Sequence, residues 1–520
     1  MSSKLKIIKN ALLYLIILLS IKPTYLLQKT LSGDDLSYWI FITSFLLDYD
    51  WKFYDEIVLQ SIEIDTVYKT LVPLHSYGSS LISIPFISIF LIFDQILNQD
   101  VLTLPNKVFN SSMYFGYYFL SSFVIFYGIK LINKSLDLLE IDYKKIDLAI
   151  IVLGSGIYYY TFNRFTLNHT FEFFVNCLII YTFTKIAKDK KTFYIPFFIF
   201  FLFLSLNIRI MNFNILFFPL VIFFLMKKDF KVFSVNYFLE KKNLIIMSFL
   251  AFLSFFSFLN YKLYGVIYRT SYCFNEFSCE SGHPYLGQNI YEVYDNFLIS
   301  LKNINGFLFG FGTGLFFSFP IIFLIIIYLF KNAVELKLKI FILGSLSVPL
   351  ITTFFWRGRE LEFNQRFLIG IVPICIIIYF YLINKKIINS KFHRILLVVS
   401  IYSIFNQSFY HVNEYVSLSE GISYMGEVLK FTNPDINFDI IVQFLGNVFF
   451  IPTFVFKSLV GINITFFSNI LNIDLINLIG INQKVIDYFI LYGQISNWNI
   501  IMINLYVFFL YRFIKKNIMI

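Results

Sequence analysis

Charged residues are scarce in this 520-residue chain. They make up 14% of it, whereas hydrophobic residues make up 58% and the mean hydropathy is +0.72. A soluble domain carries about 25% charged residues, because its surface must face water. Apolar stretches long enough to cross about 30 Å of hydrocarbon as a helix recur from end to end. The composition therefore predicts an all-α, polytopic integral membrane protein.

Several chemical signatures are also missing. The sequence has no spacing typical of a zinc site. It also has no Gly-rich nucleotide loop and no Walker motif, which disfavours an enzyme using sugar nucleotides on the inner side. Of the four cysteines, Cys177 and Cys375 fall inside apolar stretches. Cys273 and Cys279 share one loop, where an oxidising outer compartment would permit a local disulfide.

Lysine clusters punctuate the apolar stretches. They lie at residues 4–9, 130–145, 185–191, 227–242, 331–339, 385–391 and 515–516. The positive-inside rule assigns these loops to the cytoplasm. The net charge of +10 therefore follows from membrane topology and needs no nucleic-acid partner.

The lysine loops also decide how the chain threads the membrane. After a first helix near 10–28, apolar segments lie near 78–97, 108–131, 146–162, 170–187, 193–208, 211–226, 243–260, 307–330, 338–355, 367–384, 395–410 and 492–511. If 78–97 crossed fully, the later lysine loops would alternate wrongly. We therefore predict that 78–97 dips into or lies on the outer leaflet, that 411–490 is interfacial or re-entrant, and that about twelve helices span the membrane with both termini inside.

Arginine is distributed differently from lysine. This topology places six of the eight arginines on the outer face: Arg164, Arg209, Arg269, Arg357, Arg359 and Arg366. The guanidinium group binds phosphate oxygens in a bidentate manner and stays charged when half-buried. The asymmetry favours a lipid-linked phosphate or pyrophosphate at the outer surface; anchoring to lipid headgroups is the simpler alternative.

An acidic pair follows the first helix. Asp34 and Asp35 lie about one turn beyond it and precede Tyr38–Leu47, a short apolar stretch suited to lying on the membrane. A carboxylate at this depth is expensive unless it is used or paired. Opposite outer cations, it could take a proton from an acceptor as general base while the cations stabilise a leaving phosphate. Whether the pair also holds a divalent cation is open.

A set of motifs in order along residues 1–385 resembles the GT-C glycosyltransferase superfamily, specifically the transferases that use polyprenyl-phosphate sugars, such as protein O-mannosyltransferases and aminoarabinose transferases. The motifs are Gly33-Asp34-Asp35 with Tyr38; Leu74-His75-Ser76-Tyr77-Gly78, which lacks the two prolines of the family motif; Asn163-Arg164 with Asn168-His169-Thr170 and Glu172; Leu206-Asn207-Ile208-Arg209 with Asn212; Gly310–Pro320; and Trp356-Arg357-Gly358-Arg359 with Asn364–Leu368.

The resemblance implies a GT-C-like catalytic module over 1–385, with outer loops 29–76 and 262–306, followed by C-terminal transmembrane or interfacial helices over 386–520. It implies that Asp34, with Asp35 beside it, is the catalytic base. The residues implied to bind the lipid phosphate and sugar are His75, Tyr77, Arg164, His169, Arg209, Arg359 and Arg366.

The leading prediction is a glycosyltransferase of the bacterial inner membrane, with its active site on the periplasmic face. Its partners would be membrane lipid, a polyprenyl-phosphate-linked sugar as donor, and a glycan, lipid or protein as acceptor. One alternative is an O-antigen-type polymerase or ligase acting on lipid pyrophosphates, which does not need the acidic pair. Another is a flippase or transporter, which predicts ionisable residues at the centres of spans, whereas here they gather at span ends.

Overall fold

The computed structural model describes residues 34–48, 77–96, 112–162, 165, 167–226, 240–264, parts of 294–309, 314–331, 334–355, 366–418 and 497–517. In these ranges every regular element is a helix and there is no strand, so the all-α prediction is confirmed. The elements (η marks π- and 3-10 segments) are α3 (Asp34–Thr43), η1 (Ser44–Asp48), α5 (Gly78–Ile96), α7 (Ser112–Leu138), α8 (Lys145–Val152), η2 (Leu153–Ile157), α9 (Tyr158–Phe162), α10 (His169–Asp189), α11 (Tyr194–Ile208), η3 (Ile210–Leu216), α12 (Phe217–Leu225), α14 (Lys242–Tyr264), α17 (Ile304–Phe309), α18 (Leu315–Ser318), α19 (Pro320–Leu329), α20 (Leu336–Phe355), η5 (Arg366–Ile371), α21 (Val372–Asn384), α22 (Ser390–Leu418) and α27 (Asn497–Asn517).

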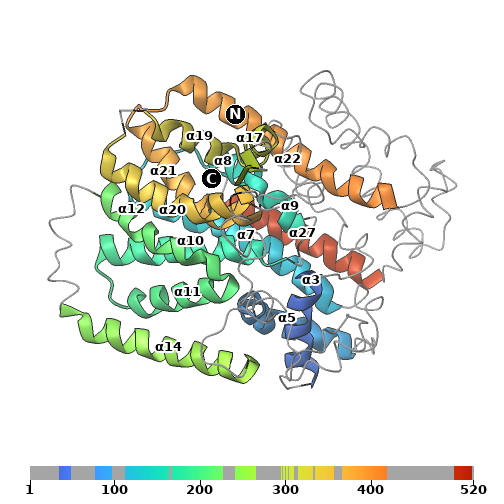
Figure 1. Cartoon of the computed structure of the whole chain (residues 1–520). Helices are drawn as coiled ribbons and strands as arrows, with labels where there is room; N and C mark the ends of the chain where they lie inside the picture. The colour runs from blue at the N-terminus through green and yellow to red at the C-terminus, as the bar shows by residue number, and fades with distance from the viewer. Residues whose placement is uncertain are drawn as a thin grey trace, which may run out of the picture.

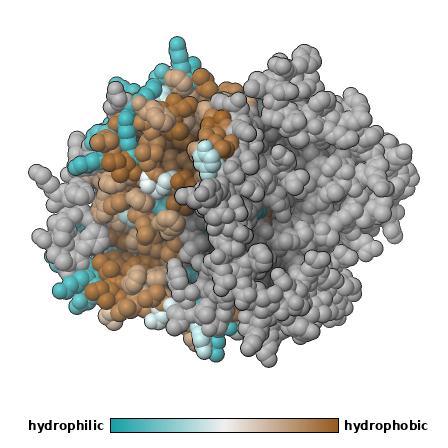
Figure 2. Space-filling view, in the orientation of Figure 1, coloured by the Kyte–Doolittle hydropathy of each residue, from teal (hydrophilic) through white to brown (hydrophobic). Residues whose placement is uncertain are grey.

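Six helical segments in the described ranges are long and apolar enough to cross a membrane: α5, α7, α10, α14, α20 and Arg366–Asn384. Helices suit hydrocarbon because they satisfy their own backbone hydrogen bonds. Figure 2 shows an apolar surface over the coloured part of the molecule, with hydrophilic residues along its left edge. The chain is therefore a multi-pass helical membrane protein.

Other apolar segments that the sequence predicts as continuous are divided in the structure. The segment near 146–162 consists of α8, η2 and α9, and the 307–330 segment is broken at Phe319 between α18 and α19. Each piece is shorter than a bilayer is thick, because a span needs about 20 residues. This division is one reason why fewer helices in the described ranges meet the length of a span than the twelve predicted from hydropathy. In addition, the predicted first helix near 10–28 lies outside those ranges, and α11 has only 15 residues.

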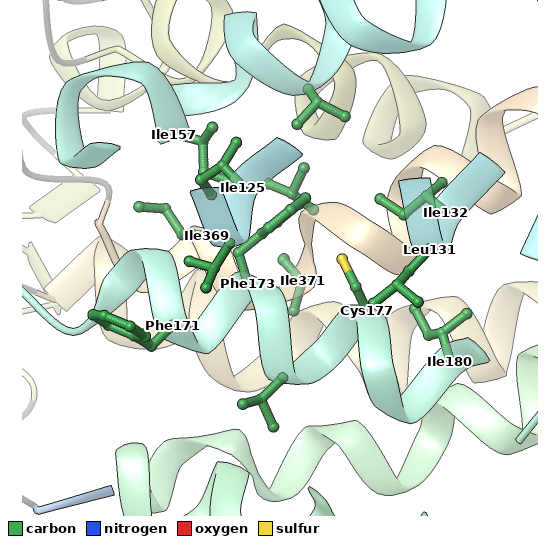
Figure 3. Packing of buried hydrophobic residues seen from close by; sticks show 14 of the residues in the cluster. Ile125, Leu131, Ile132, Ile157, Phe171, Phe173, Cys177, Ile180, Ile369 and Ile371 are labelled. Atoms are coloured by element: carbon green, nitrogen blue, oxygen red, sulfur yellow. The ribbon is translucent and has the colours of Figure 1, made fainter. Parts of the chain in front are cut away.

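Helix α10 lies at the centre of the packing, between α7, α11 and the η5–α21 segment. Figure 3 shows Phe173 and Cys177 of α10 directed toward aliphatic side chains of α7, with Ile369 and Ile371 of η5 close by. Gly128 of α7 lies against Phe173 and Cys177. A small residue at this point permits the close helix approach on which membrane packing depends.

The lysine-rich helix ends gather at one end of the bundle. Lys188, at the end of α10, forms a 2.7 Å ion pair with Glu140, in the turn after α7. Asn384, at the end of α21, exchanges two hydrogen bonds with the backbone of Asp142 in the same turn, at 2.7 and 3.0 Å. In Figure 1 this end, where α10 finishes and α14 begins, lies at the left, the side on which Figure 2 shows hydrophilic residues.

At the opposite end, the start of α10 adjoins the end of α11 and the start of α7. The side-chain amide of Asn168 donates a 3.2 Å hydrogen bond to the carbonyl of Ile208, the last residue of α11. The rings of Phe171, in the first turn of α10, and Tyr117, in the second turn of α7, are 5.7 Å apart. We call this the arginine end, because Arg209 and Arg366 lie there.

Helix α5 has both of its ends at the arginine end. A Cβ atom on Gly78, its first residue, would lie 2.5 Å from the backbone of the last two residues of α11. Near its other end, the Asp94 carboxylate accepts hydrogen bonds from the backbone N–H groups of the first two residues of α7, at 2.5 and 2.8 Å. Figure 1 shows α5 nearly end-on, whereas α10, α11 and α14 lie lengthwise. Although α5 is long enough to span, it lies across the bundle, in agreement with the prediction that 78–97 does not cross.

Helix α3 packs against both α5 and α7. The Ser80 hydroxyl donates to the carbonyl of Tyr38, and Trp39 lies edge-on to Tyr114 and Tyr117. The side chains from Tyr38 to Ile42 are all buried. The short helix predicted after the acidic pair is thus present, but it is enclosed by its neighbours rather than lying with one face on the membrane.

The described parts of the chain beyond residue 385 pack directly on the earlier helices. The Gln407 side chain of α22 accepts the backbone N–H of Tyr159 at 2.9 Å, supporting the broken segment at η2. Tyr506 of α27 is hydrogen-bonded to Ser122 of α7. Most of the predicted interfacial region 411–490 lies outside the described residues, apart from α22, which continues to Leu418.

Candidate functional site

Seven polar side chains are buried at the arginine end, where α10 begins, α11 ends and η5 begins. Each is at most 7% exposed, and together we call them the polar cluster: His169, Glu172, Asn176, Ser205, Arg209, Asn212 and Arg366. A buried polar group costs free energy unless it is hydrogen-bonded, and a buried charge costs more unless it is paired. Ionisable residues in such a position are therefore candidates for function.

A break in the helical backbone brings Arg209 into this cluster. Arg209 is extended, with φ −157° and ψ 124°, between α11 and the 3-10 segment η3. The Asn212 amide donates to both the carbonyl and the hydroxyl oxygen of Ser205, each at 3.1 Å, which ties η3 to the last turn of α11. The Arg-containing break between two helices that the sequence predicts at Leu206–Asn212 is therefore present.

Glu172 is the acidic centre of the cluster. Its Oε2 atom lies 3.3 Å from Nδ1 of His169, three residues earlier on α10, and accepts a 3.4 Å hydrogen bond from Nη1 of Arg209. The carboxylate is 1% exposed. Removing such a charge from water is expensive, so the contacts with His169 and Arg209 are what make it tolerable.

Two arginines approach the same aromatic ring. The Cζ atom of Arg209 lies 4.4 Å from the centroid of the Phe367 ring, and that of Arg366 lies 5.7 Å from it. Arginine over an aromatic face gains a cation–π attraction that increases as water is excluded. The Nε atom of Arg209 has no hydrogen-bond acceptor in the described part of the chain. Both guanidinium groups thus lie beside the Phe367 ring, and Nε of Arg209 is a donor left over.

Asn176 ties three segments together behind these charges. Its amide nitrogen donates a 2.7 Å hydrogen bond to the carbonyl of Gly370 in η5, and its oxygen accepts a 2.9 Å bond from the Ser205 hydroxyl of α11. A Cβ atom on Gly370 would lie 2.5 Å from Oε1 of Glu172. Glycine at position 370 therefore leaves the space that the carboxylate occupies.

Tyr77 lies at the same end of the bundle. Its hydroxyl is 2.9 Å from Oδ1 of Asn207 on α11 and 3.0 Å from Oδ1 of Asn260 on α14. Its ring is edge-on to Phe41 of α3, at 6.2 Å. Tyr77 thus connects α3 and the start of α5 to the helices that carry the polar cluster.

The structure brings together three of the predicted phosphate- and sugar-binding residues, His169, Arg209 and Arg366, with Tyr77 at the same end. Helix α3 begins with Asp34 and Asp35, but their side chains lie outside the described residues. The remaining predicted residues, His75, Arg164 and Arg359, also lie outside them, as do Cys273 and Cys279.

Glu172, Asn176, Ser205 and Asn212 are absent from the site predicted from sequence, although the motifs contain Glu172 and Asn212. A signal for Glu172 was available: it is a carboxylate three residues after His169 inside an apolar helix, and such residues are functional candidates by default. Asn176 and Ser205 carry no comparable signal, because isolated Asn and Ser are common in spans.

No group of three His, Cys, Asp or Glu side chains that could hold a metal ion occurs among the described residues. This statement does not include the acidic pair at the start of α3, because its side chains lie outside the described part. Comparison with known proteins gives no match to any family model, to any curated protein or to any solved structure.

Proposed function

We propose that the protein is a GT-C-type membrane glycosyltransferase, which moves a sugar from a polyprenyl-phosphate-linked donor to an acceptor on the outer face of a bacterial inner membrane. The observation that supports this proposal most is the buried convergence of His169, Arg209 and Arg366. They come from three segments far apart in the chain. Their meeting point is the end of the bundle opposite the lysine-rich helix ends.

The topology we propose has about twelve spans, with both termini in the cytoplasm and α5 lying in the outer leaflet. Two features support it: the lysine-rich ends of α7, α10 and α21 lie together, and both ends of α5 lie at the other side. The polar cluster is then at the outer face, where a lipid-linked phosphate would be presented.

In the proposed reaction, an acceptor hydroxyl attacks the anomeric carbon of the sugar as the bond from that carbon to the phosphate oxygen breaks, with inversion. Asp34 takes the acceptor's proton, and the bonding electrons leave with the phosphate. Arg209 and Arg366 stabilise the charge that develops on the phosphate, which is the most effective role for preorganised cations. His169 supplies a further polar contact beside them.

The test is turnover of purified protein in lipid nanodiscs with a polyprenyl-phosphate sugar, comparing wild type with Asp34→Asn. Loss of a general base should lower the rate by roughly 10²–10⁴-fold while donor binding persists. Near-normal turnover by Asp34→Asn would refute its role as the base. Turnover with a pyrophosphate-linked donor in place of the monophosphate would instead favour the polymerase or ligase alternative.

A further inference from the structure

Glu172 places a carboxyl group inside the site that we propose for a phosphate. Its Oε2 atom is shared between His169 and Arg209 at 3.3 and 3.4 Å. Charge-assisted hydrogen bonds between such groups are ordinarily about 2.7–2.9 Å long. The Glu172–Arg209 contact is therefore a loose ion pair on a single oxygen, and not a bidentate pair.

The Arg209 guanidinium is only partly satisfied by this carboxylate. It is 5% exposed, its Nη1 atom reaches Glu172, and its Nε atom has no acceptor within the described residues. A phosphate oxygen could accept from Nε and Nη1 in the bidentate manner that arginine favours. Such a ligand would lie beside Glu172, which contacts the same Nη1 atom.

The space that Gly370 leaves places the carboxylate of Glu172 beside Arg209. Its Oε1 atom lies where a Cβ atom on Gly370 would be, within 2.5 Å. The Gly370 backbone is in turn held by a 2.7 Å hydrogen bond from Asn176. Glu172 and a phosphate bound to Arg209 would therefore be close, and like charges in a water-poor site repel strongly.

We propose that Glu172 is a selectivity residue that makes the site bind a singly charged phosphodiester in preference to a doubly charged phosphomonoester. This inference rests on the proposed function. The donor, a sugar phosphate ester of a polyprenol, is a diester with one negative charge. The product, the polyprenyl phosphate, is a monoester with a charge of about −1.5 to −2 at pH 7. Repulsion from Glu172 weakens binding of the product more than that of the donor, and so promotes product release.

The experiment measures binding of two probes to the full chain in detergent: a short-chain polyprenyl phosphate and its methyl diester. The variants are wild type, Glu172→Gln, Glu172→Asp and Gly370→Ala. Glu172→Gln should bind the monoester tighter by on the order of tenfold, with a smaller gain for the diester, because one repulsive charge is gone. Glu172→Asp keeps the charge and should keep the wild-type preference for the diester.

Gly370→Ala provides a second route if Glu172→Gln does not fold. It keeps every charge but pushes the carboxylate away from its place, so it should also shift the preference toward the monoester. The inference would be overturned if Glu172→Gln bound the monoester no more tightly than wild type does. If only Gly370→Ala folds, the same result with that variant would overturn it. Either result would leave the proposed function intact. If neither wild type nor any variant bound either probe, the proposed phosphate site itself would be refuted.

Discussion

Replacing Asn176 by leucine tests how the polar cluster is held together. Leucine has the same number and branching of side-chain heavy atoms as asparagine, so the change removes hydrogen bonds without opening a cavity. It removes the 2.7 Å bond to the Gly370 carbonyl and the 2.9 Å bond from the Ser205 hydroxyl, both of which join separate segments. In membrane proteins such bonds average about 0.6 kcal/mol and reach about 1.7. We therefore expect Asn176→Leu to lower the free energy of unfolding by roughly 1–3 kcal/mol.

The assay is reversible unfolding of the purified protein in mixed micelles, followed by tryptophan fluorescence. Thr184→Val is the matched control, because Thr184 is buried on the same helix but, among the described residues, its hydroxyl bonds only to the carbonyl of Ile180 within α10. That change should be nearly neutral, since a hydroxyl bonded to its own helix contributes little. A double-mutant cycle with Ser205→Ala should give a favourable coupling energy between Asn176 and Ser205. Equal stability of Asn176→Leu and wild type, with no coupling, would refute the reasoning.

Three further predictions concern the arginine end and the topology. Tyr77→Phe removes a hydroxyl that lies between two asparagine side chains, so it should lower the free energy of unfolding by about 1 kcal/mol and also lower the rate of transfer. Unchanged melting and turnover would contradict the connecting role of Tyr77. Asp94→Ala removes the acceptor for two N–H groups at the start of α7, so it should lower the free energy of unfolding by about 1–2 kcal/mol. Asp94→Asn should lower it less, and an equal loss of stability in both variants would exclude a capping role. Reporter fusions after residues 140, 189 and 230 should read cytoplasmic and those after 60, 275 and 360 external; an external reading at 140 would mean that α5 crosses the membrane.

Much of the fold follows from the periodic placement of apolar and basic residues. The hydropathy of the chain predicts membrane helices because no other backbone conformation is stable in hydrocarbon without outside partners. The lysine loops predict which helix ends lie together, and the contact of Lys188 with Glu140 agrees with that prediction. They also predict that 78–97 does not cross the membrane, although its length and hydropathy alone would predict a span. Hydropathy does not reveal the breaks at η2 and Phe319. Their local causes are the positive φ of Gly156 and Pro320 at the start of α19, and Gln407 of α22 supports the first break.

The candidate site was predictable only in part. Arg209 and Arg366 stand out because the topology gathers arginine, unlike lysine, on the outer face, and His169 stands out as a rare histidine at the start of a span. The contacts that unite them depend on tertiary packing across long sequence separations. Asn176 and Gly370 meet although 194 residues separate them, and nothing local to either residue indicates the contact.

The central claim, that the arginine end holds a lipid-linked phosphate, is tested most directly by the affinity of the purified protein for a polyprenyl-phosphate analogue. Arg366→Ala should weaken binding by very roughly ten- to hundred-fold, the value of a charge-assisted contact, and Arg366→Lys should restore only part of it, because lysine lacks the bidentate fork. Arg512→Ala, which removes an exposed arginine in the lysine-bearing last turns of α27, should bind as tightly as wild type. Equal affinity in all four proteins would contradict the account and leave the outer arginines as anchors for lipid headgroups.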